Sequence, residues 1–312
     1  MECLRAQYLV PYYLLFYIND MCNISEVLNC ILFADDTSIF MSHTDVQYLQ
    51  NNFNDEIDKL IDWLYNNKLV LNLDKTNFMV FTNMQIDKNN IVVKIKDTEI
   101  KRVNSLKFLG IIIDDKLTWN EHTGVICNTL SKNIGIMNNL RFLPKEVLLM
   151  LYNALVSPYL NYCIVIWANS SIQNMNRLFK LQKRAIRIIS HSSYLAHTAP
   201  LFSCLNILNI YKLYEFQCAI FMYMCHKNVL PGSLLMYFDV NSTVHNYETR
   251  SANNYRLPLI RTNAFQKSIF FKGPKIWNEI PNDIKSSLSL NVFKKNYKHL
   301  LLGNSNSYTT VQ

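Results

Sequence analysis

The hydrophobic pattern of the chain changes near residue 119, and this change constrains the fold more than any other feature. Before it, apolar residues gather in short β-rich runs between polar turns, with one long amphipathic helix expected over residues 45–65. After it, apolar residues recur at steps of three and four, which predicts further helices. Their expected ranges are 120–140, 145–157, 172–190 and 205–228. The sequence therefore predicts an α+β fold, in which a mixed part precedes a mainly helical part.

Several short β segments are expected before residue 119. Residues 27–41 and 91–103 read as hairpins, and residues 77–82 and 106–113 read as single strands. Gly110 falls inside the last of these strands, and Thr44 is the expected N-cap of the long helix. The connections between these segments leave little room for a parallel sheet.

Charge is distributed unevenly along the 312 residues. Residues 1–129 carry 11 Lys and Arg against 17 Asp and Glu, a net charge of −6. Residues 130–312 carry 20 against 6, a net charge of +14. A strongly basic helical part suits a polyanion such as nucleic acid. A basic solvated surface explains the same charge equally well, so charge alone leaves both interpretations open.

Composition narrows the class of protein. Half of the residues are hydrophobic, which is enough for a sizeable core. The longest apolar stretch, within residues 8–18, is too short to span a bilayer and contains Pro11, and no signal peptide precedes it. The eight Cys form no Cys-x-x-Cys motif, and Cys218, Cys225 and His226 lack a fourth ligand at zinc-finger spacing. We therefore expect an intracellular protein, nuclear or cytoplasmic, with reduced and mostly buried thiols. A disulfide or zinc framework is the less favoured alternative.

Asp35 and Asp36 are adjacent carboxylates inside the apolar segment CILFADDTSIF. Neighbouring like charges repel and burial makes each more costly, so the pair needs a cation or water around it. Paired carboxylates at a hairpin tip are good ligands for Mg²⁺, which prefers oxygen and commonly binds one or two carboxylates together with substrate phosphates. Two such ions stabilise the attacking and leaving oxygens of a phosphoryl displacement. An acidic turn in water is the alternative that these two residues alone leave open.

The segment 172–190 separates charged from apolar side chains. Four cations fall on one helical face at steps of three and four, namely Arg177, Lys180, Arg184 and Arg187. Leu178, Leu181, Ala185 and Ile188 fall on the opposite face. One face is thus expected to pack, and the other to present a row of cations that either contacts phosphates or is simply solvated.

Several short motifs follow one another along the chain. FADDTSIF, at residues 33–40, resembles the catalytic hairpin of reverse transcriptases, and the motifs after it resemble those of the same enzymes in the same order. Leu69-x-Leu71-Asn72-x-x-Lys75-Thr76 resembles the next motif of the polymerase palm, and Leu106-Lys107-Phe108-Leu109-Gly110 resembles the primer grip. Further matches are Asp115, Leu117, Trp119, His122, residues 158–162, Trp167, residues 181–185, Arg250 and residues 277–281. On these motifs the chain resembles the C-terminal part of the reverse transcriptase, an RNA-directed DNA polymerase, of jockey-type non-LTR retrotransposons.

The resemblance implies a role for each matching residue. Asp35 and Asp36 would bind Mg²⁺ in a complete enzyme, Lys75 would neutralise or protonate the leaving pyrophosphate, and Asn72 would orient a loop. The positions implied to contact nucleic acid are Phe33 near the primer terminus or incoming nucleotide, Phe108, Leu109 and Gly110 at the primer end, and Arg177, Lys180, Arg184 and Arg187 at phosphates. An ordinary surface lysine remains the alternative for Lys75, and a buried strand for residues 108–110.

The resemblance also implies domains and partners. Residues 1–118 correspond to a partial palm, residues 119–195 to a helical thumb-like region, and residues 196–312 to a C-terminal, mostly helical and basic region. The implied partners are an RNA template, a DNA primer and, in a complete enzyme, deoxynucleotides. No membrane contact is expected, and nothing indicates an oligomer.

One catalytic carboxylate of the family has no counterpart in this chain. It lies well upstream of the hairpin, and the acidic residues before Asp35 are Glu2, Asp20 and Glu26, none in a matching context. Residues 11–20 resemble the end of the next motif, but Arg5-Ala6-Gln7 and Val10 stand where its Gln-Gly-Ser-like stretch and a further glycine are expected.

We therefore expect a fragment that descends from a two-metal polymerase and is inactive alone. A non-catalytic nucleic-acid-binding remnant is the alternative, and a gene-model fragment that never accumulates as protein is a third possibility.

Overall fold

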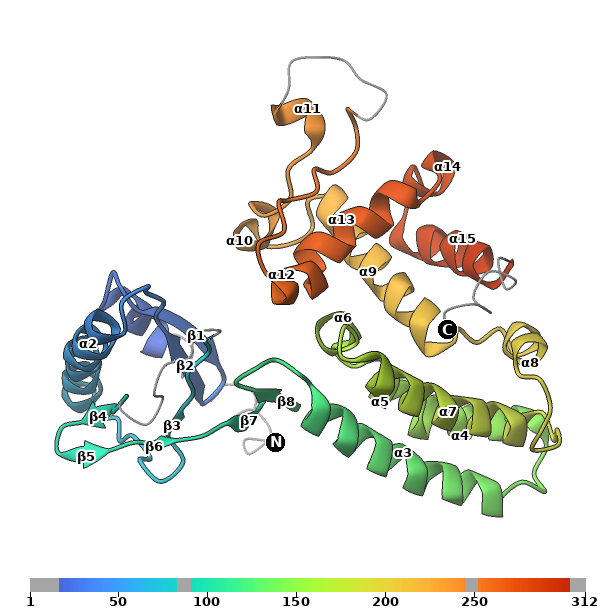
Figure 1. The fold of residues 1–312 in the computed structure, drawn as a ribbon, viewed down its shortest axis with the longest axis horizontal. Helices are drawn as coiled ribbons and strands as arrows, with labels where there is room; N and C mark the ends of the chain where they lie inside the picture. The colour runs from blue at the N-terminus through green and yellow to red at the C-terminus, as the bar shows by residue number, and fades with distance from the viewer. Residues whose placement is uncertain (1–16, 83–90, 245–251, 304–312) are drawn as a thin grey trace, which may run out of the picture. The chain divides into compact units, whose positions relative to one another are not determined.

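The computed structural model describes residues 17–82, 91–244 and 252–303 (Figure 1). The chain forms two compact units, Met1–Leu106 and Lys107–Gln312, which we call unit 1 and unit 2. Short strands and one long helix make up unit 1, and helices dominate unit 2, so the structure is compatible with the predicted α+β class. Among the helices of the described ranges, none combines the length and the apolar character that spanning a bilayer requires. Residues 5–7, Val10 and Arg250, which were matched against the motifs of the family, lie outside these ranges.

Unit 1 is built from short strand pairs and the long helix α2. Its elements are η1 (Asn19–Asn23), β1 (Asn29–Phe33), β2 (Asp36–Phe40), α2 (Val46–Asn66), β3 (Asn77–Phe78), β4 (Lys94–Ile95), β5 (Thr98–Glu99) and β6 (Lys101–Arg102). β1 with β2 and β4 with β5 form the two expected antiparallel hairpins, whereas β3 pairs with β6 in parallel. The sequence left little room for a parallel sheet, and the parallel pairing within the described ranges is this one pair of two-residue strands. The long connection between β3 and β6 includes the β4–β5 hairpin and brings the chain back in the same direction.

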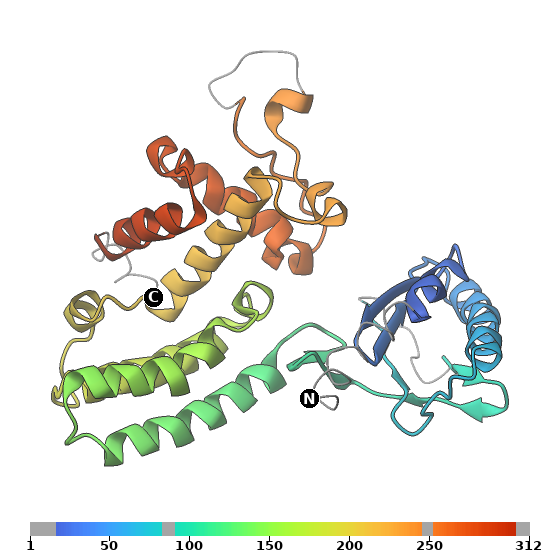
Figure 2. The ribbon, with the colours of Figure 1, turned by 180° about the vertical axis from the view of Figure 1, so that it is seen from behind.

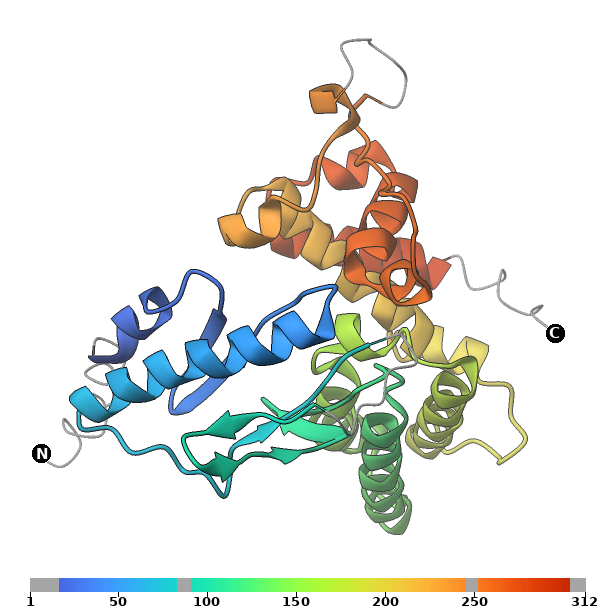
Figure 3. The ribbon, with the colours of Figure 1, turned by 60° about the vertical axis from the view of Figure 1, so that its left-hand side comes forward.

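Helix α2 covers the small strands of unit 1. The side chain of Asp45 accepts hydrogen bonds from the backbone N–H groups of Gln47 and Tyr48, so Asp45 caps the helix and the prediction of Thr44 is wrong. An Asp at this position reaches the second and third N–H groups of the helix, which have no partner inside it. Ile57 and Ile61 on the inner face pack with apolar residues of the β4–β5 hairpin in one hydrophobic cluster. Figure 3 shows α2 (blue) running alongside these strands (teal).

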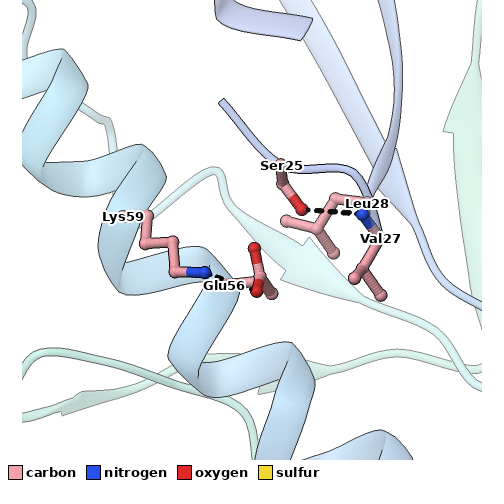
Figure 4. Close-up of polar contacts among 5 residues, drawn as sticks. All are labelled: Ser25, Val27, Leu28, Glu56 and Lys59. Carbon is pink, nitrogen blue, oxygen red and sulfur yellow. Dashed lines mark hydrogen bonds and ion pairs between the residues drawn. The ribbon is translucent and has the colours of Figure 1, made fainter. Parts of the chain in front are cut away.

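Glu56 on α2 lies next to the segment that leads into β1 (Figure 4). Its Oε1 is 2.6 Å from Nζ of Lys59. The Ser25 hydroxyl oxygen accepts hydrogen bonds from the N–H groups of Val27 and Leu28, at 3.1 and 3.0 Å. The pKa of the Glu56 carboxyl is lowered, chiefly by the hydrogen bond from Lys59 and secondly by the nearby Ser25 hydroxyl. Its other oxygen, Oε2, is buried and has no hydrogen-bond partner in the described structure.

Two expected strands differ from the structure. The strand predicted over residues 77–82 is shorter in the structure, where β3 covers Asn77–Phe78 and pairs with β6. The strand predicted over residues 106–113 is interrupted: β7 (Ser105–Phe108) and β8 (Ile111–Asp114) pair with each other across a turn. Leu109 and Gly110 form that turn with φ of 46° and 85°. Two consecutive residues with positive φ are typical of tight hairpin turns, and glycine adopts a positive φ without a steric clash because it has no Cβ atom.

Unit 2 is almost entirely helical. Its helices are α3 (Asn120–Asn139), α4 (Lys145–Leu155), α5 (Ser157–Asn161), α6 (Ile164–Trp167), α7 (Ile172–Ile189), α8 (Ala199–Cys204), α9 (Ile210–His226), α10 (Gly232–Leu235), α11 (Asn241–Val244), α12 (Asn263–Lys267), α13 (Ile269–Glu279), α14 (Asn282–Lys285) and α15 (Leu290–Gly303). The four predicted helices are confirmed with two changes. α4 ends at Leu155, shortly before Pro158, which has no N–H to continue the helical bonding. α9 begins only after Asn209, whose side chain caps it.

Two hydrophobic clusters form the core of unit 2. α3, α4 and α7 lie side by side (green to yellow in Figures 1 and 2) and bury Leu130, Ile134 and Ile186 completely. α9 packs with α13 and α15 around the aromatic residues Trp277 and Phe293. Of the seven described Cys, which all carry free thiols, Cys127, Cys218 and Cys225 are buried and Cys204 is exposed.

Gln182 connects the helices on which both clusters are built. It lies on α7 and is completely buried. Its Nε2 donates to the Tyr152 hydroxyl on α4 and to the carbonyl of Leu208, both at 3.0 Å. Its Oε1 accepts from the N–H of Ile210, the first residue of α9, at 2.9 Å. A buried amide with all these partners satisfied stabilises one arrangement of α4, α7 and α9.

Replacing Gln182 tests this junction. Gln182→Leu keeps the volume roughly constant but leaves the Leu208 carbonyl and the Ile210 N–H buried without their partner. We expect the free energy of unfolding, measured in urea by circular dichroism, to fall by about 2–4 kcal/mol. Gln173→Leu, at an exposed position of the same helix, should change it by less than about 0.5 kcal/mol. A loss below about 1 kcal/mol for Gln182→Leu would contradict the junction.

Candidate functional site

The predicted hairpin with carboxylates at its tip is confirmed. Phe33 pairs with Asp36, so Ala34 and Asp35 form the turn and Asp36 begins β2. Ala34 has φ of 51°, which reverses the chain within two residues. Both carboxylates are exposed, and Phe33 beside them is 57% exposed. Water therefore solvates the two neighbouring charges, and the cost of burial that the apolar sequence around them suggests does not arise.

The donor chemistry of this tip fits a hard cation. Two carboxylates on adjacent residues offer only oxygen atoms, which Mg²⁺ prefers. No hydrogen bond or ion pair within the described part of the chain occupies the oxygens of Asp35 or Asp36. Among the same residues, no group of three or more His, Cys, Asp or Glu side chains is placed to hold a metal ion. Within the described residues, this tip therefore offers two carboxylates to a cation and no third donor of these types.

Lys75 lies in a turn that Asn72 organises. The Asn72 carbonyl accepts bonds from the N–H groups of Lys75 and Thr76, and its side-chain oxygen accepts a second contact from Lys75 N. The loop-orienting role expected for Asn72 is consistent with this geometry. The Lys75 side chain is exposed, and no described contact joins it to Asp35 or Asp36. Its catalytic role stays a prediction.

Tyr162 holds the turn that contains Leu109 and Gly110. Its hydroxyl donates to the Leu109 carbonyl at 2.6 Å. A Cβ atom added to Gly110 would lie 3.4 Å from the Tyr162 ring, so the ring also packs on the glycine. Trp167, fully buried, donates its indole N–H to the Tyr162 carbonyl at 2.7 Å. The Tyr162 side chain is 52% exposed and acts as a support for the turn.

The far end of β8 is held by Asp114, a residue that sequence reasoning missed. Its carboxylate accepts hydrogen bonds from the N–H groups of Lys116, Thr118 and Trp119 at 3.2, 2.9 and 2.7 Å. Leu117 and Trp119 have positive φ, and these bonds stabilise that strained loop. The signal in the sequence was an Asp just before a turn, a residue that commonly bonds the backbone two residues further on.

His122 fixes α3 against the same hairpin. Its Nδ1 accepts a hydrogen bond from the N–H of Ile112 in β8 at 3.3 Å, so the proton of the neutral ring is on Nε2. Nε2 is buried and has no partner in the described structure. The ring meets Trp167 edge-on, with centroids 5.7 Å apart. Burial lowers the pKa of His122, because the charged form would lose its hydration.

The cation row of α7 is confirmed in its orientation. Arg177, Lys180 and Arg184 are exposed. Leu178, Ala185 and Ile188 are buried on the opposite side. Arg187 is half-buried, and its Nε donates to the Ala196 carbonyl at 3.0 Å. Arg187 therefore supports the following loop, and phosphate contact by its remaining donors stays a prediction.

Lys183 adds a cation that the predicted row lacked. Its Nζ lies 4.2 Å from the centre of the Phe179 ring. The pKa of Lys183 is lowered, chiefly by burial and to a smaller extent by the neighbouring charges of Arg187 and Lys180. The sequence from residue 147 to residue 214 contains no Asp or Glu. Within the described ranges the only ion pair is that of Lys59 with Glu56, so the α7 cations repel one another without a carboxylate partner. Such a surface favours an anion.

Substitution of glycines tests the turn in unit 2. Gly110→Ala forces a positive φ on a residue with a Cβ and brings that Cβ against Tyr162, so the free energy of unfolding should fall by about 1–2 kcal/mol. Gly124→Ala, inside α3 with nothing within 4 Å of the added atom, should raise it by about 0.5–1 kcal/mol. Thermal and urea unfolding measure both variants. Equal effects of the two substitutions would contradict the geometry of the turn.

The pH dependence of stability tests the burial of His122. Because its pKa is lowered in the folded protein, protons bind the unfolded chain more readily, and the free energy of unfolding should fall as pH decreases below about 6.5. His122→Asn keeps an acceptor for Ile112 and should make this decrease less steep between about pH 5 and pH 7. A remaining slope is expected, because the pKa of His226 is lowered as well, chiefly by burial. An unchanged slope in the variant would contradict the assignment.

Comparison with known proteins gives a single group of relatives. The chain is 23% identical over 170 residues, 53% of its length, to a protein described as RNA-directed DNA polymerase from mobile element jockey of Drosophila funebris. It is 23% identical over 207 residues, 65% of its length, to the protein of the same description from Drosophila melanogaster. It is 25% identical over 182 residues to a probable RNA-directed DNA polymerase from transposon BS of the same species. No protein-family model matches the chain. No solved structure matches it either.

The matched regions are a small part of these relatives. They cover 18%, 22% and 20% of the relatives' own lengths, so the chain spans about a fifth of the curated proteins it matches. The matches are nevertheless consistent in kind, and they agree with the motifs that the sequence presents in order from residue 33 onward. Over more than half of its length, the chain is similar to the RNA-directed DNA polymerases of jockey-type mobile elements.

Proposed function

We propose that this chain is the part of a reverse transcriptase that holds template and primer, with unit 2 as its nucleic-acid-binding part. The cation row of α7 carries the proposal, because three exposed cations lie on one face in a stretch with no acidic residue. Arg and Lys side chains in such a row contact phosphate oxygens of a nucleic acid and position it without reading its sequence. The similarity to RNA-directed DNA polymerases supports the same class of ligand.

The β7–β8 turn would position the end of the primer. Gly110 is exposed and has no side chain, so another backbone can approach it closely. Tyr162 restrains the turn through the Leu109 carbonyl, which makes the approach surface rigid. Phe108 and Leu109 are half-buried, so their role would be to shape this surface.

Asp35 and Asp36 would hold Mg²⁺ at the hairpin tip. When bound, the ion neutralises charge that develops on phosphate oxygens during nucleotidyl transfer. The exposed Phe33 next to the carboxylates would contact the incoming nucleotide or the primer terminus through its ring. Lys75 would neutralise the pyrophosphate that leaves.

We further propose that this chain does not extend a primer alone. Two-metal chemistry requires more carboxylate ligands than one adjacent pair, and the acidic residues before Asp35 stand in no matching context. A primer annealed to an RNA template, with Mg²⁺ or Mn²⁺ and deoxynucleotides, is the assay. The chain should incorporate no more nucleotide than Asp35→Ala. Robust synthesis that Asp35→Ala abolishes, and that the exposed control Asp58→Ala retains, would overturn this part of the proposal.

A non-catalytic nucleic-acid-binding module is the second candidate. The α7 row favours it as strongly, since phosphate contacts need no metal. Both functions require binding that weakens with salt. They differ at the hairpin: a template–primer holder with a metal site should bind its substrate more tightly with Mg²⁺ plus a deoxynucleotide, and Asp35→Ala should remove that gain. If Mg²⁺ and a deoxynucleotide do not tighten binding by the unsubstituted chain, the result favours the non-catalytic nucleic-acid-binding module.

A further inference from the structure

The loop between α7 and α8 presents an aromatic ring at the end of the cation row. Tyr194 is 80% exposed and its neighbour Leu195 is 84% exposed. The guanidinium carbon of Arg187 lies 5.9 Å from the centre of the Tyr194 ring. Arg187 thus belongs to the row on α7 and also lies within cation–π range of the ring, which joins the two features into one surface.

Two arginines hold this loop in place. Arg187 donates from Nε to the Ala196 carbonyl at 3.0 Å, and Arg141 donates from Nη2 to the Ser192 carbonyl at 2.7 Å. Arg141 comes from the turn between α3 and α4, which Figure 1 shows beside the loop at the same end of the helices. Each guanidinium has five N–H donors and uses one of them in these bonds, so both retain donors for a ligand. No carboxylate in the described part of the chain pairs with either.

The arrangement of charge and ring fits one class of ligand. From Arg177 to Arg187 the row is about 15 Å long, which matches about four steps of a strand whose bases remain stacked at about 3.4 Å per step. An exposed ring at the end of such a row is suited to stack on a base, and stacking is a large and sequence-tolerant part of single-strand binding. A duplex has no free base face to offer along its length, because its bases stack on each other.

We propose that Tyr194 is a stacking platform for an unpaired base of a single-stranded nucleic acid whose phosphates lie along α7. The proposal rests on the nucleic-acid binding proposed above and adds the site and the single-stranded character of the ligand. Arg141 and Arg187 are positioning residues for the ring, and they also supply charge to the phosphate nearest to it. Phe142, next to Arg141 and 80% exposed, stands at the same end and offers a second apolar surface.

Binding of two labelled probes to the full chain tests the proposal. The probes are a short oligothymidylate and a blunt duplex of the same length, each titrated at several salt concentrations by fluorescence anisotropy. Tyr194→Ala should weaken binding of the single strand about 5- to 100-fold, leave duplex binding within about twofold, and leave the salt slope unchanged. Tyr194→Trp should retain binding, and its indole fluorescence should be quenched by the oligothymidylate. Leu195→Ala, equally exposed in the same loop, should bind as the unsubstituted chain does.

The outcomes separate this site from the proposed function. If the unsubstituted chain binds neither probe in a salt-dependent way, the proposed function and this site both fail. If it binds but Tyr194→Ala binds the single strand equally well, or loses both probes alike, the stacking site fails and the proposed function stands. Displacement of the oligothymidylate by poly-glutamate at an equal concentration of charge would show that the surface accepts any acidic polymer, which also overturns the site.

Discussion

The buried amide of Gln182 is the interaction on which the arrangement of unit 2 depends. It bonds a hydroxyl on α4 and two backbone groups at and just before the start of α9, so it fixes, together with the apolar face of α7, which side of this helix faces the core. Once that side is buried, Arg177, Lys180 and Arg184 face outward, since helical geometry places them on the opposite side. A polar group with all its partners satisfied is more specific than an apolar contact, because a rotation of α7 would leave buried donors and acceptors unpaired. The position of the charged surface therefore follows from a contact inside the core.

A second set of restraints supports the β7–β8 hairpin from the helical side. Tyr162 bonds its turn, Asp114 organises the loop after it, and His122 bonds its second strand. Each of these side chains bonds backbone groups, so each restrains the path of the chain. A surface that must meet a nucleic acid at the same place in every encounter benefits from such restraint, because less conformational entropy is lost on binding.

Local patterns predicted what depends on neighbours in the sequence. The spacing of apolar residues predicted α3 and α7 to within a residue or two, and the Ala-Asp-Asp motif predicted the hairpin tip, because both signals are contained in the segment itself. The turn at Gly110 was missed, since LKFLGIII is apolar apart from Lys107 and its pattern marks no reversal.

Contacts between residues far apart in the sequence could not be predicted from local patterns. Tyr162 bonds Leu109 from 53 residues away, and Arg141 bonds Ser192 from 51 residues away. For the same reason the cation row was predictable from helical spacing, whereas the loop that ends it with Tyr194 was not. The parallel pairing of β3 with β6 likewise depends on a hairpin inserted between them.

The central claim is that unit 2 binds nucleic acid through the exposed cations of α7, and salt dependence measures it most directly. The logarithm of the dissociation constant for a single-stranded oligonucleotide is plotted against the logarithm of salt concentration, for the chain and for a variant with Arg177→Ser, Lys180→Ser and Arg184→Ser. Each phosphate contact contributes about 0.7 to the slope on a single strand, so the variant should lose about 2 of it together with much of its affinity. A variant that folds as the unsubstituted chain does and keeps the full slope would contradict the claim.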